Sequence, residues 1–392
     1  MKSYRIFQVI PGAGTVLSNN VSSIWKNILH YPLIDLGHDV YLLDYYYDTF
    51  FINATDDVWL SKHEPDFSNF FWKMFYAEHK INKFDFCFLY LCDGFINFEI
   101  IEKIKRLNVP VFNFSCNNIH QFFLVKNICK VVTCSLYSEK HAKAKFDAEG
   151  VHSIHFQLSA NPNIYINTLS KKTIDVSFVG TRYANRGYFL SEIINQHINT
   201  EIYGPRWQKQ DNSISNLSFS DLYNRIFSML QKNGFNYSIK FLTGRLADLY
   251  KKKTESKMLF DSIKGQIDDE TMLKVFNSSK INLGLSTVNS ENTDFGTNLN
   301  HIKLRDFEIP MCGGFYLIEY LEEIEEYYIL GKEIECFTDK DEMIDKIKFY
   351  LLHDNSRESI ANSGYQRSIK EHTSQLRFQK LFSNTYFSKL IN

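Results

Sequence analysis

Residues 298–312 combine charged and amide side chains at helical spacing, and a glycine pair ends the stretch. We expect a helix here that follows a polar loop, so that its N-terminal amides form an anion site suited to a phosphate. Asn300 and His301 are expected near the first turn, beside the anion. Arg305 and Glu308 are three residues apart and share one helix face, and a carboxylate such as Glu308 can accept two hydrogen bonds from a ribose diol. An ordinary Arg–Glu pair on an amphipathic helix is the alternative that this spacing leaves open.

A second group of cations follows a predicted strand at 174–179. Gly180 can let the backbone approach a ligand closely, and Arg182 or Arg186 can hold phosphate oxygens with two parallel hydrogen bonds. An exposed arginine after a strand-to-helix turn is the plainer interpretation of the same residues. The pattern alone does not separate the two.

Polar residues also follow two predicted strands in the first half, at the strand ends where parallel sheets place ligands. Asp93 follows the third strand, and Asn117, Asn118 and His120 follow the fourth. Asp93 and His120 are the candidate catalytic residues, because each can accept a proton. A turn carboxylate before a glycine is the alternative for Asp93, and a hydrogen-bonded structural histidine is the alternative for His120.

Two glycines, Gly12 and Gly14, follow the first predicted strand. A tight turn there can leave room for a cleft, so we assign both to a cleft loop. Leu17 stands where a Gly-x-Gly-x-x-Gly motif needs its third glycine, so no dinucleotide cofactor is predicted.

The elements that must position these residues alternate between strand and helix, which predicts an α/β protein with parallel sheets. A polar stretch over 161–172 marks a boundary. We expect one domain over 1–165, a second over 166–380 and a helical tail over 381–392. The predicted strands are 4–10, 40–45, 84–92, 109–114, 131–134, 174–179, 200–204, 280–286 and 315–318, and the predicted helices are 18–36, 99–107, 138–149, 185–196, 270–279, 298–312, 341–353 and 356–372.

Composition excludes several classes of protein. The 392 residues are 44% hydrophobic and 23% charged with a formal net charge of −1, which argues against a general nucleic-acid binder. No apolar run reaches the ~18–20 residues that cross a bilayer, and short lysine runs such as 251–253 predict at most a peripheral membrane contact. The seven cysteines contain no Cys-x-x-Cys pair, so we expect reduced thiols in a cytoplasmic protein and no metal site.

Four motifs in the second half resemble, in their order, those of CgeB-like (spore maturation protein-like) glycosyltransferases. The resemblance covers about residues 174–380 and is most specific in the last motif. It implies a GT-B fold, in which two Rossmann-like domains face each other across a cleft, with C-terminal helices. The motifs are Val179-Gly180-Thr181-Arg182, Ile202-Tyr203-Gly204, Asn282-Leu283-Gly284 and Leu304-Arg305-Asp306-Phe307-Glu308-Ile309-Pro310-Met311-Cys312-Gly313-Gly314.

The resemblance also implies an activity: a bacterial hexosyltransferase that moves a sugar from a UDP- or GDP-linked donor to a surface glycan or a protein. It implies that Glu308 contacts the donor ribose and that Arg182, Arg186 and Lys303 hold the diphosphate. Side-chain cations and a helix terminus then neutralise the leaving group, so no metal and no cofactor is expected.

The resemblance implies one further assignment, and the sequence departs from the family pattern at two positions. Tyr203 and Gly204 end a strand near the expected nucleobase pocket. Asn300 stands where the wider group has a glutamate, and Asn117 stands where an acidic residue is expected. A non-catalytic nucleotide- or glycan-binding protein that retains the GT-B fold is therefore the alternative function.

Overall fold

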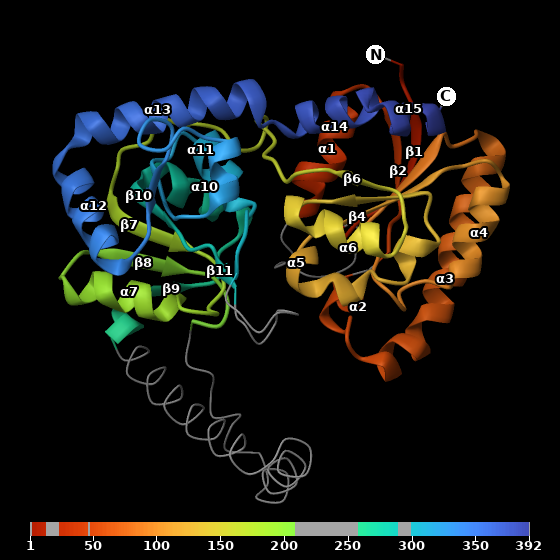
Figure 1. Cartoon of the computed structure of the whole chain (residues 1–392), viewed down its shortest axis with the longest axis horizontal. Helices are drawn as coiled ribbons and strands as arrows, with labels where there is room; N and C mark the ends of the chain where they lie inside the picture. Colours follow the sequence, from red (N-terminus) through yellow and green to blue (C-terminus); the bar gives the residue numbers. More distant parts are fainter. Residues whose placement is uncertain (1, 13–22, 46–47, 208–257, 289–298, 392) are drawn as a thin grey trace, which may run out of the picture.

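Two α/β domains make up the computed structural model of the chain (Figure 1). It describes residues 2–12, 23–45, 48–207, 258–288 and 299–391. Each domain is built on a six-stranded sheet in which every pairing is parallel, and helices cover the sheets. The predicted fold class is confirmed.

The first sheet has the strand order β2-β1-β3-β4-β5-β6. All residues of β3 and β4 are buried, as expected for parallel strands covered on both faces. The direction in which strands are added reverses between β1 and β3, and crevices at such switch points hold ligands. The strands are β1 (Arg5–Val9), β2 (Asp39–Leu42), β3 (Phe86–Leu89), β4 (Val111–Ser115), β5 (Cys134–Tyr137) and β6 (Ser153–His155).

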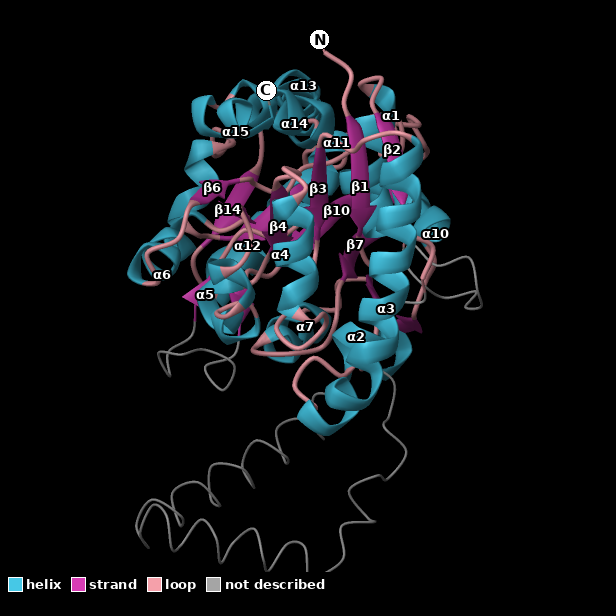
Figure 2. Cartoon of the chain, turned by 90° about the vertical axis from the view of Figure 1, so that its right-hand side faces the viewer, coloured by secondary structure: helices cyan, strands magenta, loops and turns pink. Residues whose placement is uncertain are grey.

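Figure 2 shows α3 and α4 lying side by side over one face of the first sheet. In α3, Phe67, Phe71 and Phe75 recur at every fourth residue and are fully buried, so one apolar stripe fastens this 25-residue helix to the sheet. The helices of this domain are α1 (Tyr31–Asp35), α2 (Asp48–Ile52), α3 (Asp57–Ile81), α4 (Phe98–Arg106), α5 (Asn118–Gln121) and α6 (Lys143–Ala148), and a π-helical turn over Lys26–His30 precedes α1.

The second sheet has the order β14-β13-β10-β7-β8-β9, and its switch point lies between β7 and β10. Its strands are β7 (Ile174–Val179), β8 (Thr200–Tyr203), β9 (Ile263–Gly265), β10 (Ser279–Gly284), β13 (Tyr316–Glu319) and β14 (Glu335–Phe337). The short strands β11 (Thr287–Val288) and β12 (Leu299–Asn300) pair separately, and the helices are α7 (Arg186–Asn195), α10 (Asp269–Ser278), α11 (Arg305–Met311), α12 (Lys340–Leu352) and α13 (Asp354–Glu371).

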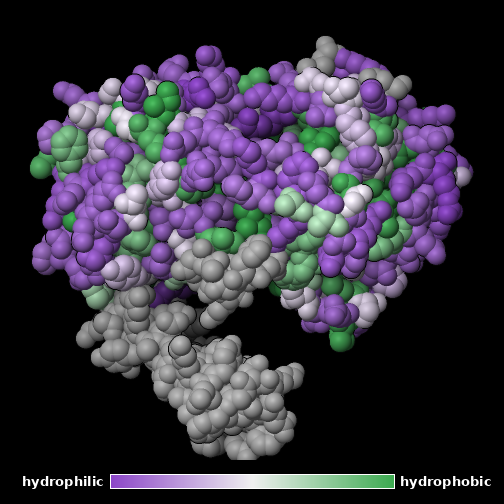
Figure 3. Space-filling model, in the orientation of Figure 1, coloured by the Kyte–Doolittle hydropathy of each residue, from purple (hydrophilic) through white to green (hydrophobic). Residues whose placement is uncertain are grey.

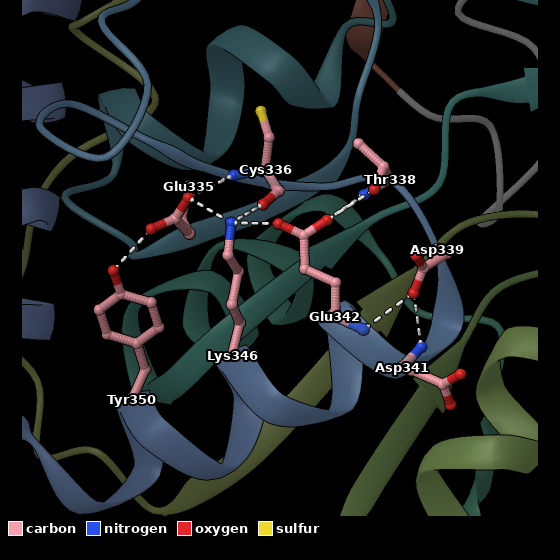
Figure 4. A network of polar contacts seen from close by, with 8 residues as sticks. All are labelled: Glu335, Cys336, Thr338, Asp339, Asp341, Glu342, Lys346 and Tyr350. Carbon is pink, nitrogen blue, oxygen red and sulfur yellow. Dashed lines mark hydrogen bonds and ion pairs between the residues drawn. The ribbon is translucent and has the colours of Figure 1, made fainter.

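A polar network fastens α12 to β14 (Figure 4). The Lys346 ammonium lies 3.1 Å from Glu335 Oε1 and 2.8 Å from Glu342 Oε1, and Tyr350 donates to Glu335 Oε2 at 2.6 Å. The hydrogen bond from Lys346 is the main reason that the pKa of Glu342 falls to about 2. Each of these carboxylates has its partners within the network, so the network holds the helix in place.

The last two helices return to the first domain. Helices α14 (Ser374–Ser383) and α15 (Thr385–Ile391) lie over the first sheet at the upper right of Figure 1. The ring of Phe387 stacks on Phe112 at a centroid distance of 4.1 Å. Phe378 and Phe387 thus pack against strands of the first sheet, whereas the sequence analysis places residues 166–380 in the second domain and 381–392 in a tail.

Two predicted elements need correction, and several observed elements have no predicted counterpart. The chain at 299–304 forms β12 and a turn, so the predicted helix over 298–312 begins only at Arg305. The strand predicted at 131–134 lies at 134–137, and β6, β9, β14 and α3 were not predicted. The other predicted strands and the helices at 99–107, 185–196, 270–279, 341–353 and 356–372 are confirmed, with ends that shift by a few residues.

No helix in the described part of the chain is long and apolar enough to cross a membrane. On the face drawn in Figure 3, hydrophobic residues are scattered among hydrophilic ones.

Candidate functional site

The polar residues of the second domain gather at its switch point. The turn after β7 and the turn after β10 lie side by side there, because β7 and β10 are neighbours in the sheet. Arg186, at the start of α7, joins the two turns: it donates from Nη1 to Thr181 O at 2.7 Å and from Nη2 to Leu285 O at 3.1 Å. Arg186 is only 5% exposed, and its burial lowers the pKa of the guanidinium. Its role in this structure is to fix the shape of the site.

Lys303 comes from the turn before α11 and donates from Nζ to Ser286 O, at the end of β10. Burial, together with the nearby positive charge of Arg186, lowers the pKa of Lys303 to about 7, against the opposing pull of Asp306 and Glu319. An anion placed beside this ammonium favours its protonated form. The charge of Lys303 therefore depends on what lies beside its ammonium.

Two carboxylates at this edge are held by other groups. Glu319, the last residue of β13, accepts from Ser286 N at 2.8 Å and from Thr287 N at 3.0 Å. Asp306 accepts from Tyr316 OH and from Lys303 N, both at 2.7 Å, and burial raises its pKa to about 6. The two acids shape the turns that carry the cations, and sequence analysis did not assign either of them.

Arg182 lies on the same edge, next to β8. Its guanidinium lies 5.6 Å from the ring centroid of Trp207, whose Nε1 donates to Gly180 O at 2.6 Å. Gly204 is needed here, because its φ is +129° and a Cβ would collide with Gly180 O. Gly180, Arg182 and Gly204 therefore lie together at this edge.

The side chain of Tyr203 points away from this group. Its side chain is 9% exposed and packs in a small apolar cluster with Ile174 and Val275, and its hydroxyl donates to Glu201 on the same strand. The Tyr203 side chain therefore belongs to the core, while its carbonyl accepts from Gly180 N at 2.9 Å.

Arg305 and Glu308 do form a pair, but it is a buried one. Glu308 is fully buried and accepts from Arg305 at one oxygen and from the Tyr165 hydroxyl at the other. Tyr165 comes from the segment that joins the two domains. Both oxygens of Glu308 are thus engaged inside the protein rather than open to a ribose.

Asn300 and His301, expected near the first turn of this helix, lie four to five residues before α11 begins at Arg305. Asn300 donates to Tyr320 O at 3.0 Å and accepts from Thr287 Oγ1 at 2.9 Å. His301 is 5% exposed, and burial lowers the pKa of its imidazole well below its ordinary value. Its ring lies 5.4 Å from the ring of His120, which comes from the first domain. The two domains therefore meet at these histidines.

In the first domain, α5 carries His120 and is held at both ends. Glu139 accepts from Asn117 N and, at 3.0 Å, from Asn118 N. Lys145 donates from Nζ to Ile119 O at 2.6 Å. A carboxylate thus meets the amide end of the helix and an ammonium meets a carbonyl, which is the favourable sense for a helix dipole.

Glu139 is 1% exposed, and burial raises its pKa to about 7. Glu139 is not among the predicted site residues, because the sequence pattern places the strand at 131–134, three residues before β5, and places Glu139 in the following helix. With β5 ending at Tyr137, the rule that ligand-facing residues follow strand ends would have found it. Asn117 has a φ of +63°, a conformation that asparagine tolerates better than most residues.

Asp93 and Gly12 flank the switch point of the first sheet. The Asp93 carboxylate accepts from Asn127 N at 2.9 Å and from Ile128 N at 2.7 Å, while burial raises its pKa. This favours the turn-forming interpretation over that of a free base. Gly12 has a φ of +75° and donates to Asp48 Oδ1 at 2.8 Å. Gly14 lies outside the described residues.

Two sequence expectations concern metals and thiols. Within the described ranges, no group of three or more His, Cys, Asp or Glu side chains could hold a metal ion. The seven cysteines are free thiols, and all but Cys116 are buried.

Comparison of the whole chain with solved structures gave matches over nearly its full length. A sucrose-phosphate synthase from Thermosynechococcus elongatus matches at 10% identity with a TM-score of 0.58, over 98% of this chain and 100% of that one. A structure of Anabaena Alr3699/HepE with UDP and glucose matches at 9% identity with a TM-score of 0.59, over 98% of this chain and 100% of that one. The fold is GT-B. The switch point of the second GT-B domain is thus the edge that carries Arg182, Arg186 and Lys303.

Two further comparisons bear on family. Residues 250–383 match the model of a family described as glycosyl transferase-like. A putative UDP-N-acetylglucosamine 2-epimerase from Listeria monocytogenes shares the GT-B fold at 9% identity with a TM-score of 0.52, over 99% of this chain and 98% of that one, so the fold alone does not fix a reaction. A search of curated proteins gave no match.

Proposed function

We propose that this protein is a glycosyltransferase that moves a sugar from a nucleotide-diphosphate donor, held by the second domain, to an acceptor at the first. The observation that carries the proposal is the cationic edge, which we define as Arg182, Arg186 and Lys303 at the switch point of the second sheet. The match of residues 250–383 to a glycosyl transferase-like family supports the reaction class.

The cationic edge suits the chemistry of glycosyl transfer. The reaction develops negative charge on the departing diphosphate, and a fixed cation or amide stabilises such charge without reorganisation. Loss of one such group typically costs ~3–4 kcal/mol in the transition state. Lys303, whose pKa in the free protein is about 7, gains its proton as the diphosphate binds. We therefore propose that side-chain cations neutralise the leaving group and that the reaction needs no metal or other cofactor.

The donor is proposed to be a UDP-linked hexose. The structures of Anabaena Alr3699/HepE, which share the fold, contain UDP, glucose or UDP-glucose. A GDP-linked donor is the second choice for the same site. The resemblance to CgeB-like enzymes supports a bacterial, cytoplasmic enzyme of surface glycan biosynthesis, acting on a glycan or a protein.

We assign His120 as the base that accepts the proton of the acceptor hydroxyl. The place of His120 in the structure supports this assignment: the residue lies where the two domains meet, and Glu139 and Lys145 hold the helix that carries it. Asp93 is the second candidate. Contact between Glu308 and the donor ribose requires that the Tyr165 hydroxyl release one carboxylate oxygen, and we propose that the donor replaces this hydrogen bond.

A panel of nucleotides and nucleotide sugars tests the proposal. Calorimetry with UDP, GDP and UDP-glucose is expected to show binding of one nucleoside diphosphate, and its sugar conjugate is expected to hydrolyse slowly without an acceptor. Absence of binding to every nucleotide in the panel contradicts the proposal. Binding with neither hydrolysis nor transfer supports the alternative, a non-catalytic protein that retains the fold.

A further inference from the structure

The outer side of α3 and α4 carries cations that are not paired with carboxylates. Figure 2 shows the two helices on the side of the molecule turned to the viewer, in front of the first sheet. Residues 72–83 and 102–107, which include the last turns of both helices, contain six Lys or Arg residues and two Glu residues. Among the described residues, five of these cations are exposed and have no ion-pair partner; they are Lys73, Lys80, Lys83, Lys103 and Arg106.

The two carboxylates of these stretches are engaged by other cations. The Glu78 carboxylate lies 3.1 Å from the Arg5 guanidinium. The Glu102 carboxylate lies 2.9 Å from the Lys105 ammonium. This side of the domain is therefore locally positive, although the whole chain has a formal net charge of −1. Interaction with the helix dipole explains cations in a last turn, but not Lys73, which lies eight residues before the end of α3.

Aromatic rings lie among these cations. Trp72 and Tyr76 stack on successive turns of α3, with ring centroids 5.2 Å apart. The Lys80 ammonium lies 4.3 Å from the Tyr76 ring centroid. The Lys103 ammonium, from α4, lies 5.7 Å from the ring centroid of Trp72. Rings and ammonium groups therefore alternate across both helices, and we call these four residues the aromatic–cation strip.

Exposed apolar side chains lie at the ends of the same two helices. Ile81, the last residue of α3, is 80% exposed, and Leu107, which follows α4, is 38% exposed. Because α3 leads into β3 and α4 leads into β4, both residues lie at the edge of the first sheet opposite the carboxyl ends of its strands. This surface is therefore separate from the cationic edge and from the residues assigned to the transfer.

The combination of groups fits the headgroup layer of a lipid bilayer. Trp and Tyr are enriched at membrane–water interfaces, because each ring has an apolar body and a polar tip. Lys and Arg can lay their apolar stems along such a surface while the charged ends reach the headgroups. Anionic lipids attract each of these cations within about a Debye length. An acidic protein would match the charge alone, whereas the bilayer interface also accepts the exposed Ile81 and Leu107 side chains.

We propose that the aromatic–cation strip is a peripheral membrane-binding surface that recognises anionic phospholipid headgroups. The Trp72 and Tyr76 rings lie at headgroup level, and the neighbouring ammonium groups meet lipid phosphates. The chain then rests on the bilayer through the α3–α4 side, and the strand carboxyl ends of the first sheet are left uncovered. The proposal does not depend on the proposed glycosyltransferase function.

Cosedimentation with lipid vesicles tests the proposal. We expect wild type to bind vesicles of phosphatidylcholine with phosphatidylglycerol but not vesicles of phosphatidylcholine alone. Salt is expected to release it, because the Debye length falls from about 10 Å at 0.1 M to about 3 Å at 1 M. The double variant Lys80→Glu with Lys103→Glu is expected to lower the partition coefficient at least about 25-fold, since each cation near an anionic surface contributes roughly fivefold, or ~1 kcal/mol. Tyr76→Ala is expected to lower it severalfold without a change of charge.

A matched control separates the strip from the net charge of the chain. Lys264→Glu with Lys332→Glu makes the same change of charge at two exposed lysines of the second domain, and it is expected to keep the partition coefficient within about twofold of wild type. Thermal unfolding midpoints equal to that of wild type verify that the variants fold. Failure of wild type to bind the mixed vesicles would overturn the proposal, even if an acidic protein binds the strip. Equal losses in the two double variants would overturn it as well.

Discussion

Lys303 provides a pH-dependent signature for diphosphate binding. Its pKa of about 7 in the free protein means that the amine is mostly neutral at pH 8.5. A bound diphosphate raises that pKa, so binding above pH 7 takes up one proton, and the affinity falls about tenfold, or ~1.4 kcal/mol, for each further pH unit. The diphosphate itself is fully ionised in this range, because phosphate groups have a second pKa near ~6.

Two substitutions isolate this effect. Lys303→Met removes a charge-assisted hydrogen bond and is expected to weaken UDP binding at pH 6.5 by about 10- to 150-fold, the equivalent of ~1.5–3 kcal/mol, with a much smaller loss at pH 9. Lys303→Arg keeps the charge at every pH, so its affinity is expected to vary little between pH 7 and 9. Calorimetry in buffers of different ionisation enthalpy measures the proton uptake directly. A wild-type affinity that stays constant from pH 7 to 9, without proton uptake, would refute the reasoning.

Three other predictions concern the framework of the site. The pKa of Glu139 is about 7 in the folded chain and 4.5 ordinarily, so its contribution to stability is present below pH 4.5 and is lost as the pH rises to 7. The loss, measured by chemical denaturation, should be at most roughly 3 kcal/mol and should disappear in Glu139→Gln; an unchanged pH dependence in that variant would contradict the prediction. Gly204→Ala should destabilise the protein and weaken UDP binding, because the new Cβ would collide with Gly180 O. Gly331→Ala is the control: its φ is +72° and nothing lies within 4 Å of the new Cβ, so it should lower stability by only ~1 kcal/mol and leave UDP binding unchanged. Phe387→Ala should lower the free energy of unfolding by ~3–5 kcal/mol, because the ring is fully buried against the first sheet. Leu352→Ala, at a side chain that is 82% exposed, should change it by no more than ~0.5 kcal/mol. Equal effects of the two substitutions would argue against the C-terminal helices as part of the first domain's core.

Much of the fold could be predicted from the alternation of apolar runs and turn residues. β7, β8 and β10 follow from short apolar runs that end at glycine or polar residues, and their adjacency at one edge follows from parallel sheet topology. For this reason Gly180, Arg182 and Gly204, which follow these strands, lie together in the structure.

The failures have local physical causes. The stretch before α11 has helical spacing, but the Asp306 side chain accepts from Lys303 N and forms a turn, so side-chain hydrogen bonding replaces the first helical turns. Glu308 could not be placed because its partner Tyr165 is 143 residues away in the chain. The C-terminal helices could not be assigned to the first domain, since only tertiary packing brings Phe387 to Phe112.

A crystal structure of the protein with UDP would show whether the cationic edge holds a diphosphate. We expect the diphosphate at the carboxyl end of β7 and β10, with Lys303 Nζ and the Arg182 guanidinium within hydrogen-bonding distance of its oxygens. A diphosphate bound elsewhere, with Lys303 still donating to Ser286 O and no phosphate near either cation, would contradict it.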